Sequence, residues 1–360
     1  MRIFIPILGF ARAGGYRVLS KLASEWAKQG HEVFFIINYR SEAPYFPTVA
    51  SIIWINDRGA QVEINSPELK KPNFWVFRNL LSLKRAIDSL VKDRESIILA
   101  NHSLTAYPVF FSSSPGKKFY YIQAYEPEFY SCKIKESVSN FILFFLSSLT
   151  YFFPLKRIVN SPVYFRYKLC RANWYVPPGL DQAVFLPKKE LSKTVNKVGI
   201  IGREDEFKGT AIGCQVFTVL QEEFEHLELR VAYYLPKKYK DKKNVFHIVP
   251  QNDQELSDFY RSCDVILALG TIQLGAPHYP VIEGMACGCA MVTTGYFPAT
   301  EDNAWIVPVG DIHMPVSIVR QLIKNPELAI EKLEKALADC QELAWINVAQ
   351  KMMGYFNCNE

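Results

Sequence analysis

The segment His278–Val292, HYPVIEGMACGCAMV, carries the pattern that decides the fold: a loop, a short helix and a buried strand in direct succession. A lone acid, Glu283, stands where the helix is expected to begin, and the small residues after it let the helix press close to a sheet. A carboxylate suits the hydroxyl pair of a ligand, and a helix N-terminus favours an anion such as phosphate. The alternative is a buried packing helix that happens to carry an acid.

The composition indicates a folded protein of two domains. The chain has 360 residues, 49% of them hydrophobic and 21% charged, which is too long for one ordinary core. The net charge of +5 fits an anionic small ligand or an acidic membrane surface. No basic run is interleaved with aromatic residues, so we expect no nucleic acid partner.

The cysteines and the N-terminus indicate the compartment. Eight cysteines occur without a CxxC pair or metal-type spacing, which favours free thiols in a reducing cytosol. The sequence runs from Met1 directly into a strand, without the apolar core of a signal peptide. We therefore expect a cytoplasmic protein.

The apolar stretch Phe141–Phe153, FILFFLSSLTYFF, is the one candidate for membrane contact. It is shorter than the roughly 18 to 20 residues that span a bilayer. A buried helix is the first expectation. The alternative is an interfacial helix that rests the protein on a membrane, as a peripheral contact.

Strand and helix patterns alternate along the whole chain, which predicts α/β architecture with parallel sheets. In the first half, strands are expected at 2–8, 31–37, 52–55, 96–100, 118–123 and 157–161. In the second, they are expected at 198–201, 227–234, 245–249, 264–269, 290–294 and 304–307. Prolines and a charged tract between 177 and 197 separate the halves. We predict two Rossmann-like, doubly wound domains, 1–187 and 188–338, facing a central cleft.

Several separated motifs resemble one family, the GT-B fold nucleotide-sugar glycosyltransferases of family four. They are Gly14-Gly15, Gly30-His31-Glu32-Val33, Pro177-Pro178-Gly179-Leu180-Asp181, Gly202-Arg203, Lys208-Gly209, Glu283-Gly284-Met285-Ala286-Cys287-Gly288 and Glu301–Val307. The segment Gln123-Ala124-Tyr125-Glu126-Pro127 resembles the branch that contains bacterial rhamnosyltransferases. Nearly the whole chain is covered by these motifs, which stand in the family's order.

The resemblance implies a retaining transfer of a sugar from a nucleoside diphosphate to a glycan hydroxyl, in surface polysaccharide assembly. It implies a nucleotide-sugar donor and a glycan or lipid-linked glycan acceptor as partners, and no cofactor. A final segment, 339–360, is implied to pack back on the first domain, which takes the acceptor. No metal is expected, since no DxD-like triplet lies between strands and Asn252 with Glu255 is better interpreted as a helix N-terminus.

Arg203 and Lys208 flank the end of a predicted strand, which makes them candidate catalytic and donor-binding residues. A diphosphate leaving group gains negative charge during sugar transfer, and two cations can stabilise that charge without a metal. The alternative is a surface ion pair with one of the acids at 204–206.

Glu283 matches the second acid of the family's Glu-x7-Glu motif, whose implied role is to hold the ribose hydroxyls. The first acid is expected at 275, where this chain has Gly275. Two explanations remain open: the activity is lost, or the donor sugar lacks the usual hydroxyl pattern, as a deoxysugar does.

The remaining donor-binding candidates lie in loops. In the loop 276–280, which includes Tyr279, Pro277 lacks an N–H group and His278 can supply a side-chain donor instead; a surface histidine in a turn is the alternative. By family analogy, backbone near Val249 meets the nucleobase. Gly14 and Gly15 let backbone approach the donor phosphate, although they are not a GxGxxG motif, which disfavours a dehydrogenase.

In the first half, His102 is implied to contact the donor sugar and is a catalytic candidate; a capping or core histidine is the alternative. Gln123, Tyr125 and Glu126 follow a strand on the implied acceptor side. Glu126 is a candidate acid or base, with a loop salt bridge as the alternative. Two other functions remain open: a nucleotide-sugar epimerase, and a catalytically silent nucleotide-sugar binding protein.

Overall fold

A computed structural model describes residues 1–10, 14–63, 70–72, 74–132, 134–135, 137–172, 174–188 and 194–358. The chain divides into two compact units, Met1–Pro178 with Trp345–Glu360, and Gly179–Ala344. Residues 179–187, placed in the first half by the sequence, therefore lie in the second unit. There the Leu180 amide donates to the Leu343 carbonyl at 2.7 Å, and the Phe185 and Tyr260 ring centroids are 6.3 Å apart.

The first unit is built on a parallel sheet of seven strands in the order β3-β2-β1-β4-β5-β6-β7. The strands are β1 (Arg2–Pro6), β2 (Glu32–Asn38), β3 (Ser51–Ile55), β4 (Ile97–Ala100), β5 (Lys117–Ile122), β6 (Lys156–Val159) and β7 (Trp174–Tyr175). Runs of β-branched and aromatic residues buried on both faces explain the parallel pairing. The six predicted strands are confirmed, and the short edge strand β7 was not predicted.

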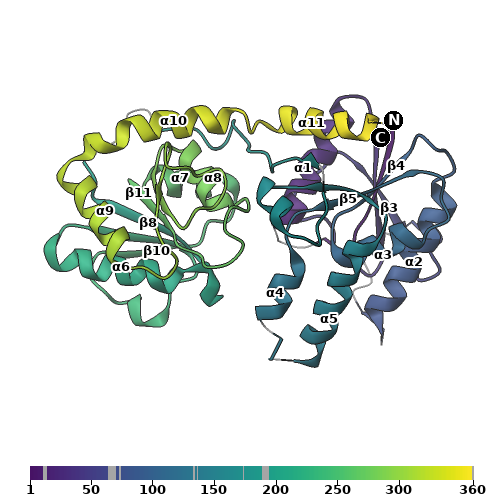
Figure 1. Ribbon diagram of the computed structural model, residues 1–360, viewed down its shortest axis with the longest axis horizontal. Helices are drawn as coiled ribbons and strands as arrows, with labels where there is room; N and C mark the ends of the chain where they lie inside the picture. The colour runs from purple at the N-terminus through teal and green to yellow at the C-terminus, as the bar shows by residue number, and fades with distance from the viewer. Residues whose placement is uncertain are drawn as a thin grey trace. The chain divides into compact units, whose positions relative to one another are not determined.

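Helices cover both faces of this sheet (Figure 1). They are α1 (Gly14–Lys28), α2 (Trp75–Leu90), α3 (Ser103–Phe111), α4 (Glu126–Cys132), α5 (Val138–Leu149) and α11 (Trp345–Asn357). Helix α11 packs on α1, where the Trp26 indole donates to the Ala349 carbonyl at 3.1 Å. Helices α2, α3 and α5 pack in succession, on the opposite face, because parallel crossovers are right-handed.

The expectation that Phe141–Phe153 forms a buried helix is wrong. Helix α5 exists, but the side chains of Phe141 and Phe145 are 56% and 57% exposed. The face of α5 turned toward the protein carries Ser147, which is 1% exposed, together with the half-buried Leu143 and Leu146. The hydrophobicity of the stretch predicted burial, whereas the neighbouring helices leave the face with Phe141 and Phe145 uncovered.

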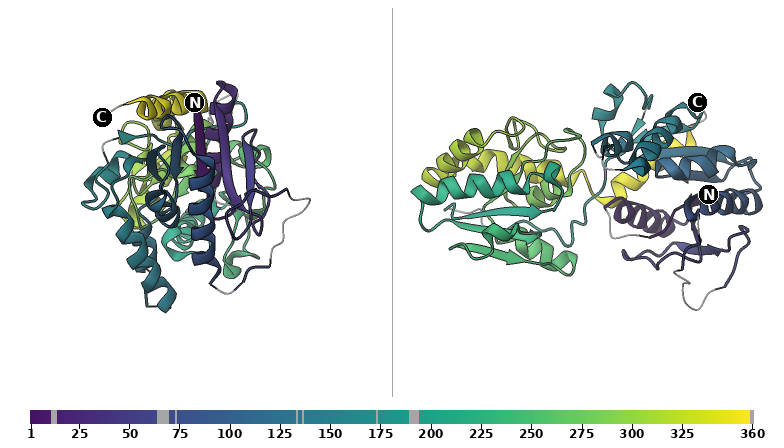
Figure 2. Two further views of the ribbon diagram at one scale, coloured as in Figure 1. Left: turned by 90° about the vertical axis from the view of Figure 1, so that its right-hand side faces the viewer. Right: turned by 90° about the horizontal axis from the view of Figure 1, so that it is seen from below.

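The second unit repeats the architecture, with helices packed around a sheet (Figure 2). This parallel sheet has six strands in the order β10-β9-β8-β11-β12-β13. The strands are β8 (Lys197–Gly202), β9 (Glu228–Tyr233), β10 (Val245–Ile248), β11 (Val265–Ala268), β12 (Ala290–Thr293) and β13 (Trp305–Ile306). The helices are α6 (Thr210–Glu223), α7 (Asp253–Arg261), α8 (Tyr279–Ala286), α9 (His313–Lys324) and α10 (Ile330–Gln341). Helices α6 and α9 cover one face, and α7, α8 and α10 the other.

In each sheet, successive strands are added first on one side of the first strand and then on the other. The candidate sites lie where this change of side occurs. In the first unit the chain leaves β1 toward β2 on one side, and β4 starts the opposite side. In the second unit, β8 and β11 stand in the same relationship. Loops that follow two such neighbouring strands diverge and leave a crevice at the carboxyl edge of the sheet, where α/β proteins bind ligands.

Candidate functional site

In the second unit, a rigid turn follows β8 and presents Arg203 and Lys208. The Arg203 N–H donates to the Thr210 hydroxyl at 2.8 Å, and that hydroxyl donates to the Arg203 carbonyl at 2.9 Å. Gly209 closes the turn with φ of 75°, and a Cβ there would lie 2.0 Å from the Leu269 carbonyl oxygen. The loop after β11 therefore packs directly on this turn, which fixes the start of α6.

The two cations lie near each other, and neither forms a salt bridge with a carboxylate of the described residues. The Arg203 guanidinium stacks over the Tyr233 ring at 4.8 Å. Burial, and then the charge of Arg203, lower the pKa of the Lys208 ammonium. In the part of the chain that is described, neither side chain forms a salt bridge with the acids at 204–206, although the charge of Asp205 raises the pKa of Lys208 and so opposes part of the lowering. Their positive charge remains available to an anion.

His278 lies beside these cations. It occupies the cap position before α8, its ring lies 4.6 Å from that of Tyr296, and its Nδ1 atom is buried with no hydrogen-bond partner among the described residues. Burial, and then the charges of Lys208 and Arg203, lower the pKa of the His278 imidazole to about 3. The imidazole is therefore neutral at physiological pH. The His278 side chain is half-buried, and its Nδ1 atom is out of contact with solvent, unlike that of a fully exposed surface histidine.

Glu283 lies deeper than the sequence indicated. Helix α8 begins at Tyr279, with Pro280 in its first turn, so the expectation that Glu283 stands at the helix N-terminus is wrong. The residue is 2% exposed, and its Oε2 atom accepts a 2.9 Å hydrogen bond from the Tyr260 hydroxyl. Proline is favoured at helix starts, and this preference, rather than the acid, sets the beginning of α8.

The loop before α8 explains what stands at position 275. Gly275 has φ of 83°, and its N–H donates to the Gly295 carbonyl at 2.8 Å. A glutamate would be strained in this left-handed conformation. The Tyr279 hydroxyl reaches the Gly179 carbonyl at 3.4 Å, within the same unit.

Val249 follows β10 and is half exposed, and its carbonyl accepts a 2.7 Å hydrogen bond from the Gln251 side chain. The predicted cap is confirmed: the Asn252 side chain accepts from the Glu255 N–H at 2.9 Å at the start of α7.

In the first unit, the start of α1 and the loop after β5 meet. The Gln123 side chain donates to the Gly15 carbonyl at 3.3 Å. Gly14 and Gly15 form the start of α1, and a Cβ on Gly15 would lie 3.4 Å from the Gln123 side chain. The Asn160 amide donates to the Gln123 carbonyl at 2.6 Å, which joins the end of β6 to this cluster.

His102 and Glu126 meet at the N-terminus of α3. His102 caps this helix, since its Nδ1 accepts from the Leu104 N–H at 3.1 Å. Its Nε2 lies 3.7 Å from Oε2 of Glu126. Both Glu126 oxygens also accept from the Ser103 N–H, at 3.1 and 3.0 Å. The capping alternative for His102 is thus confirmed, although its Nε2 still faces Glu126.

Aromatic side chains surround this cluster. Burial, and then the charge of Glu126, raise the pKa of the Tyr16 hydroxyl to about 12. The Tyr125 ring lies 5.2 Å from that of Tyr151 and 4.7 Å from that of Tyr167. Tyr125 therefore packs into a tyrosine cluster beside the candidate acid.

Comparison with known proteins bears on the fold. No family model matches the chain. The structure is similar to sucrose-phosphate synthase from Thermosynechococcus elongatus, with a TM-score of 0.73 at 15% identity over 99% of this chain and 98% of that one. It is also similar to HepE from Anabaena in complex with UDP and glucose, with a TM-score of 0.68 at 13% identity over 99% of both. The chain has the GT-B fold of glycosyltransferases.

The chain is also similar in sequence to a curated protein. Over 237 residues it is 24% identical to the O-antigen biosynthesis protein RfbC from Myxococcus xanthus. The matched region is 64% of this chain and 17% of that protein, so the chain spans a small part of its relative.

The GT-B units contain three residues that sequence reasoning missed: Thr210, Tyr233 and Tyr260. Thr210 was visible as a hydroxyl directly after Lys208-Gly209, at the start of a predicted helix. The two tyrosines come from β9 and α7, so only the folded sheet brings them to Arg203 and Glu283. Within the described ranges, no group of three potential metal ligands is present and all eight cysteines are free.

Proposed function

We propose that this protein is a glycosyltransferase that moves a sugar from a nucleoside diphosphate to a hydroxyl of a glycan acceptor. The observation that carries the proposal is the group formed by Arg203, Lys208 and neutral His278 at the carboxyl edge of the second sheet. Two cations that form no salt bridge with a described carboxylate suit a diphosphate, and so does an imidazole whose buried Nδ1 has no hydrogen-bond partner among the described residues.

The chemistry follows from charge. As the bond to the sugar breaks, negative charge grows on the diphosphate, and fixed cations stabilise it without reorganisation. Arg203 offers a planar fork, held over Tyr233, and Lys208 a partly desolvated point charge. We propose that transfer needs no metal and retains the anomeric configuration.

Glu283 is the residue from which we infer the nucleotide of the donor. Because Tyr260 holds one carboxylate oxygen, the side chain has a fixed orientation in which to accept hydrogen bonds from ribose hydroxyls. A vicinal diol is present in a ribonucleotide and absent in a deoxyribonucleotide. Glu283 therefore favours a UDP- or GDP-sugar over dTDP-rhamnose, the donor that a rhamnosyltransferase would use. HepE binds UDP and glucose, which agrees with a ribonucleotide.

The first unit supplies the acceptor side of the proposal. His102 and Glu126 lie 3.7 Å apart and can hold sugar hydroxyls or transfer a proton, while Gln123 and Tyr125 line the neighbouring loop. The role of RfbC in O-antigen biosynthesis supports a glycan or lipid-linked glycan as the acceptor, with transfer in the cytoplasm.

The test measures binding and transfer separately. Melting temperatures are recorded with UDP-, GDP- and dTDP-sugars, since a ligand that binds the native state raises the melting point according to its affinity. Each stabilising donor is then incubated with and without glycan acceptors, in buffer and in EDTA. We expect one ribonucleotide sugar to stabilise the protein and its sugar to appear on an acceptor, with EDTA making no difference. The absence of stabilisation by every donor would contradict the proposal.

A second function is favoured by Gly275, which stands in place of the usual acid and has a left-handed backbone that would strain a glutamate. A catalytically silent nucleotide-sugar binding protein would show the same thermal shift and no transfer to any acceptor. Release of an epimerised sugar without acceptor would instead indicate the epimerase.

A further inference from the structure

Helix α5 turns its apolar residues away from the protein. Val138, Phe141, Ile142 and Phe145 are all exposed and recur at the spacing of one helix face. The opposite side of the helix carries buried Ser147, whose hydroxyl donates to the Phe144 carbonyl at 3.0 Å. A helix that only completed a core would show the reverse arrangement. A contiguous exposed apolar face of this kind marks an interaction site.

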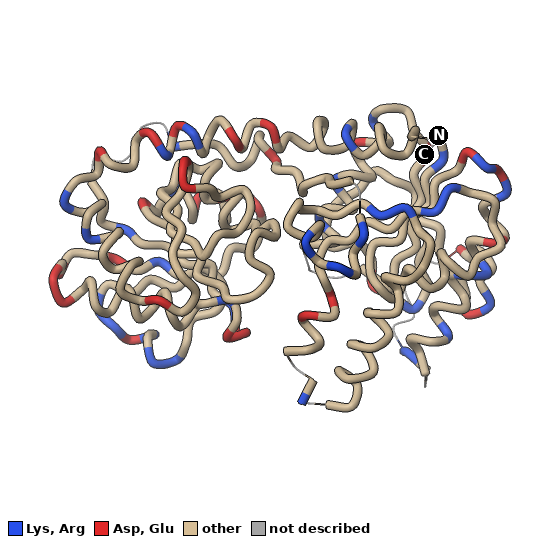
Figure 3. Tube along the Cα trace, viewed as in Figure 1, with Lys and Arg blue, Asp and Glu red and all other residues tan. Residues whose placement is uncertain are grey.

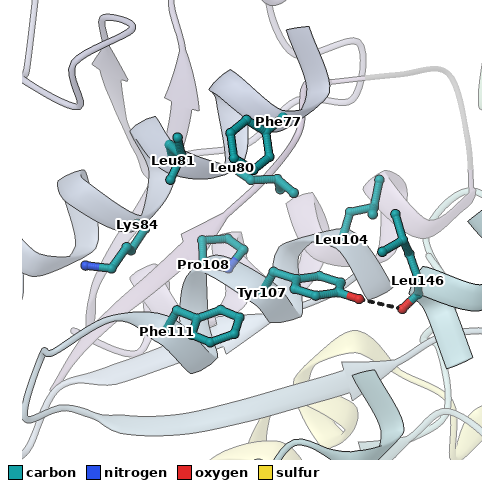
Figure 4. Close-up of a pocket in the computed structure, with 9 residues that line it drawn as sticks. All are labelled: Phe77, Leu80, Leu81, Lys84, Leu104, Tyr107, Pro108, Phe111 and Leu146. Carbon is teal, nitrogen blue, oxygen red and sulfur yellow. Dashed lines mark hydrogen bonds between the residues drawn. The ribbon is translucent and has the colours of Figure 1, made fainter. Parts of the chain in front are cut away.

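A groove beside α5 extends this apolar face. It has a volume of about 490 Å³ and lies between α2, α3 and α5 (Figure 4). Phe77, Leu81, Phe111 and Leu146 line it. Tyr107 also lines the groove, and its hydroxyl donates to the Leu146 carbonyl at 2.8 Å (dashed in Figure 4). The groove therefore offers almost no hydrogen bonding and suits a hydrocarbon chain.

The charges on the α2 side of this face are mostly positive, whereas α4, which packs on α5, carries Glu126 and Glu128 in its first turn. Helix α5 carries no charged residue and is tan along its length in Figure 3. Between positions 70 and 87 the sequence has five cations and no acid: Lys70, Lys71, Arg78, Lys84 and Arg85. Lys84, on the groove, pairs with Asp88 at 2.6 Å. Arg78 and Arg85 are exposed and make no salt bridge with any described residue.

We propose that this face of the first unit binds the surface of an anionic lipid bilayer. Helix α5 lies in the interfacial plane with its phenylalanines among the acyl chains, the groove accepts one lipid chain, and the cations of α2 contact anionic headgroups. At 12 residues, α5 is too short to span a bilayer, and no helix of the described chain is long and apolar enough to do so.

Charge selects the bilayer over a second copy of the chain. In a two-fold dimer the same patch meets itself, so the cations of α2 would face their equivalents. An anionic bilayer offers the opposite charge together with an apolar layer, and both components of the face are then satisfied. The inference concerns the first unit alone and does not depend on sugar transfer.

The test is co-sedimentation of the full chain with large vesicles. One set contains phosphatidylcholine alone, and the other contains about 30 mol% phosphatidylglycerol, which gives an anionic surface. We expect binding to the anionic vesicles, weakened by about tenfold or more in Phe141→Ser/Phe145→Ser. The matched control Leu328→Ser/Ile330→Ser removes two exposed apolar residues of the second unit and should bind like the wild type. Because all four positions are exposed, folding is checked simply by equal melting temperatures.

A second variant separates the electrostatic component. Arg78→Gln/Arg85→Gln should weaken binding to anionic vesicles and leave the weak binding to neutral vesicles unchanged, and added salt should have the same effect on the wild type. Equal sedimentation of the wild type and the α5 variant would overturn the proposal. So would a wild-type dimer that dissociates in the α5 variant, because the face would then be an interface between copies.

Discussion

The Tyr260 hydroxyl donates a 2.9 Å hydrogen bond to Oε2 of Glu283, and both side chains are buried. Burial, and then the charge of Glu283, raise the pKa of the Tyr260 hydroxyl well above its usual range. Tyr260 therefore stays protonated and acts as a permanent donor. It joins α7 to α8 and holds the carboxylate in one orientation.

This geometry predicts how Glu283→Gln will behave. Glutamine keeps the shape and an acceptor for Tyr260, but it loses the charge that strengthens hydrogen bonds to ribose. We expect the wild type to bind UDP at least about tenfold tighter than 2′-deoxy-UDP, since a hydrogen bond to a charged group contributes roughly 1.5–3 kcal/mol. The variant should bind the two alike. Calorimetry with Glu331→Gln, an exposed acid on α10, is the control; a preserved ratio in Glu283→Gln would remove Glu283 from the ribose site.

Arg203→Ala should reduce both turnover and nucleotide affinity. The side chain forms no salt bridge with a described carboxylate that would be left behind, so the change removes a ligand contact without leaving a buried charge unpaired. The loss of a charged hydrogen bond predicts a decrease of about tenfold or more in kcat. Arg203→Lys should recover little, because an ammonium cannot replace the planar fork. Lys240→Ala, at an exposed position of the same unit, should behave as wild type; unchanged kinetics in Arg203→Ala would contradict the assignment.

The fold could be predicted because the hydrophobic periodicities of strands and helices alternate regularly along the chain. Parallel strands buried on both faces are continuous apolar runs, as in β4 and β11, and such runs need no long-range information. Strand β7 has two residues and is held at the edge by pairing with β6, so its sequence carries little signal. The prediction for α5 was wrong for another reason. Hydrophobicity predicts that a segment tends to be buried, but it does not predict which face of a helix the rest of the fold covers.

The candidate site was predictable in its residues and less so in its geometry. Arg203 and Lys208 were found because they follow a recognisable strand. Their positions relative to the neighbouring acids depend on the turn fixed by Thr210, which no local pattern shows. The depth of Glu283 was misjudged because a helix start was assigned to the acid rather than to Pro280. Contacts between distant segments, such as Tyr260 with Glu283, are products of the fold.

His278 predicts an acid-sensitive stability. Its folded pKa of about 3 lies below the unfolded value of 6.5, so between these values the unfolded state binds more protons and stability rises with pH. The contribution is complete above the unfolded pKa and is lost as pH falls toward the folded one. Between about pH 7 and pH 5 the loss is at most about 2 kcal/mol.

The variant that isolates this effect is His278→Asn, compared with His226→Asn, which changes an exposed histidine of the same unit. Chemical denaturation at the two pH values should show a smaller decrease in the free energy of unfolding for His278→Asn than for the wild type. The His226 variant should retain the wild-type decrease. Parallel curves for all three proteins would show that His278 titrates normally.

Glu126→Gln should separate stability from transfer. The carboxylate accepts two contacts from the Ser103 N–H at the N-terminus of α3, so neutralisation should cost about 1 kcal/mol of stability. If Glu126 serves the acceptor, transfer should also fall at least tenfold while donor affinity stays constant. Glu128→Gln on the same helix disturbs the 3.0 Å hydrogen bond from Tyr167 and should leave transfer unchanged. Equal transfer rates in both variants would place Glu126 in a purely structural role.

Gly209→Ala tests the turn on which the cation pair depends. Gly209 combines φ of 75° with a Cβ position 2.0 Å from the Leu269 carbonyl oxygen, so alanine must displace the backbone after β11. Gly310 has a similar φ of 78° with nothing within 4 Å of its Cβ position. Gly310→Ala should therefore cost only the left-handed conformation, about 1–2 kcal/mol. Gly209→Ala should cost clearly more, roughly 3 kcal/mol or above, and should weaken nucleotide binding because Lys208 moves with the turn. Equal losses of unfolding free energy in the two variants, measured with denaturant, would show that the loop after β11 can move away from the Gly209 turn without cost.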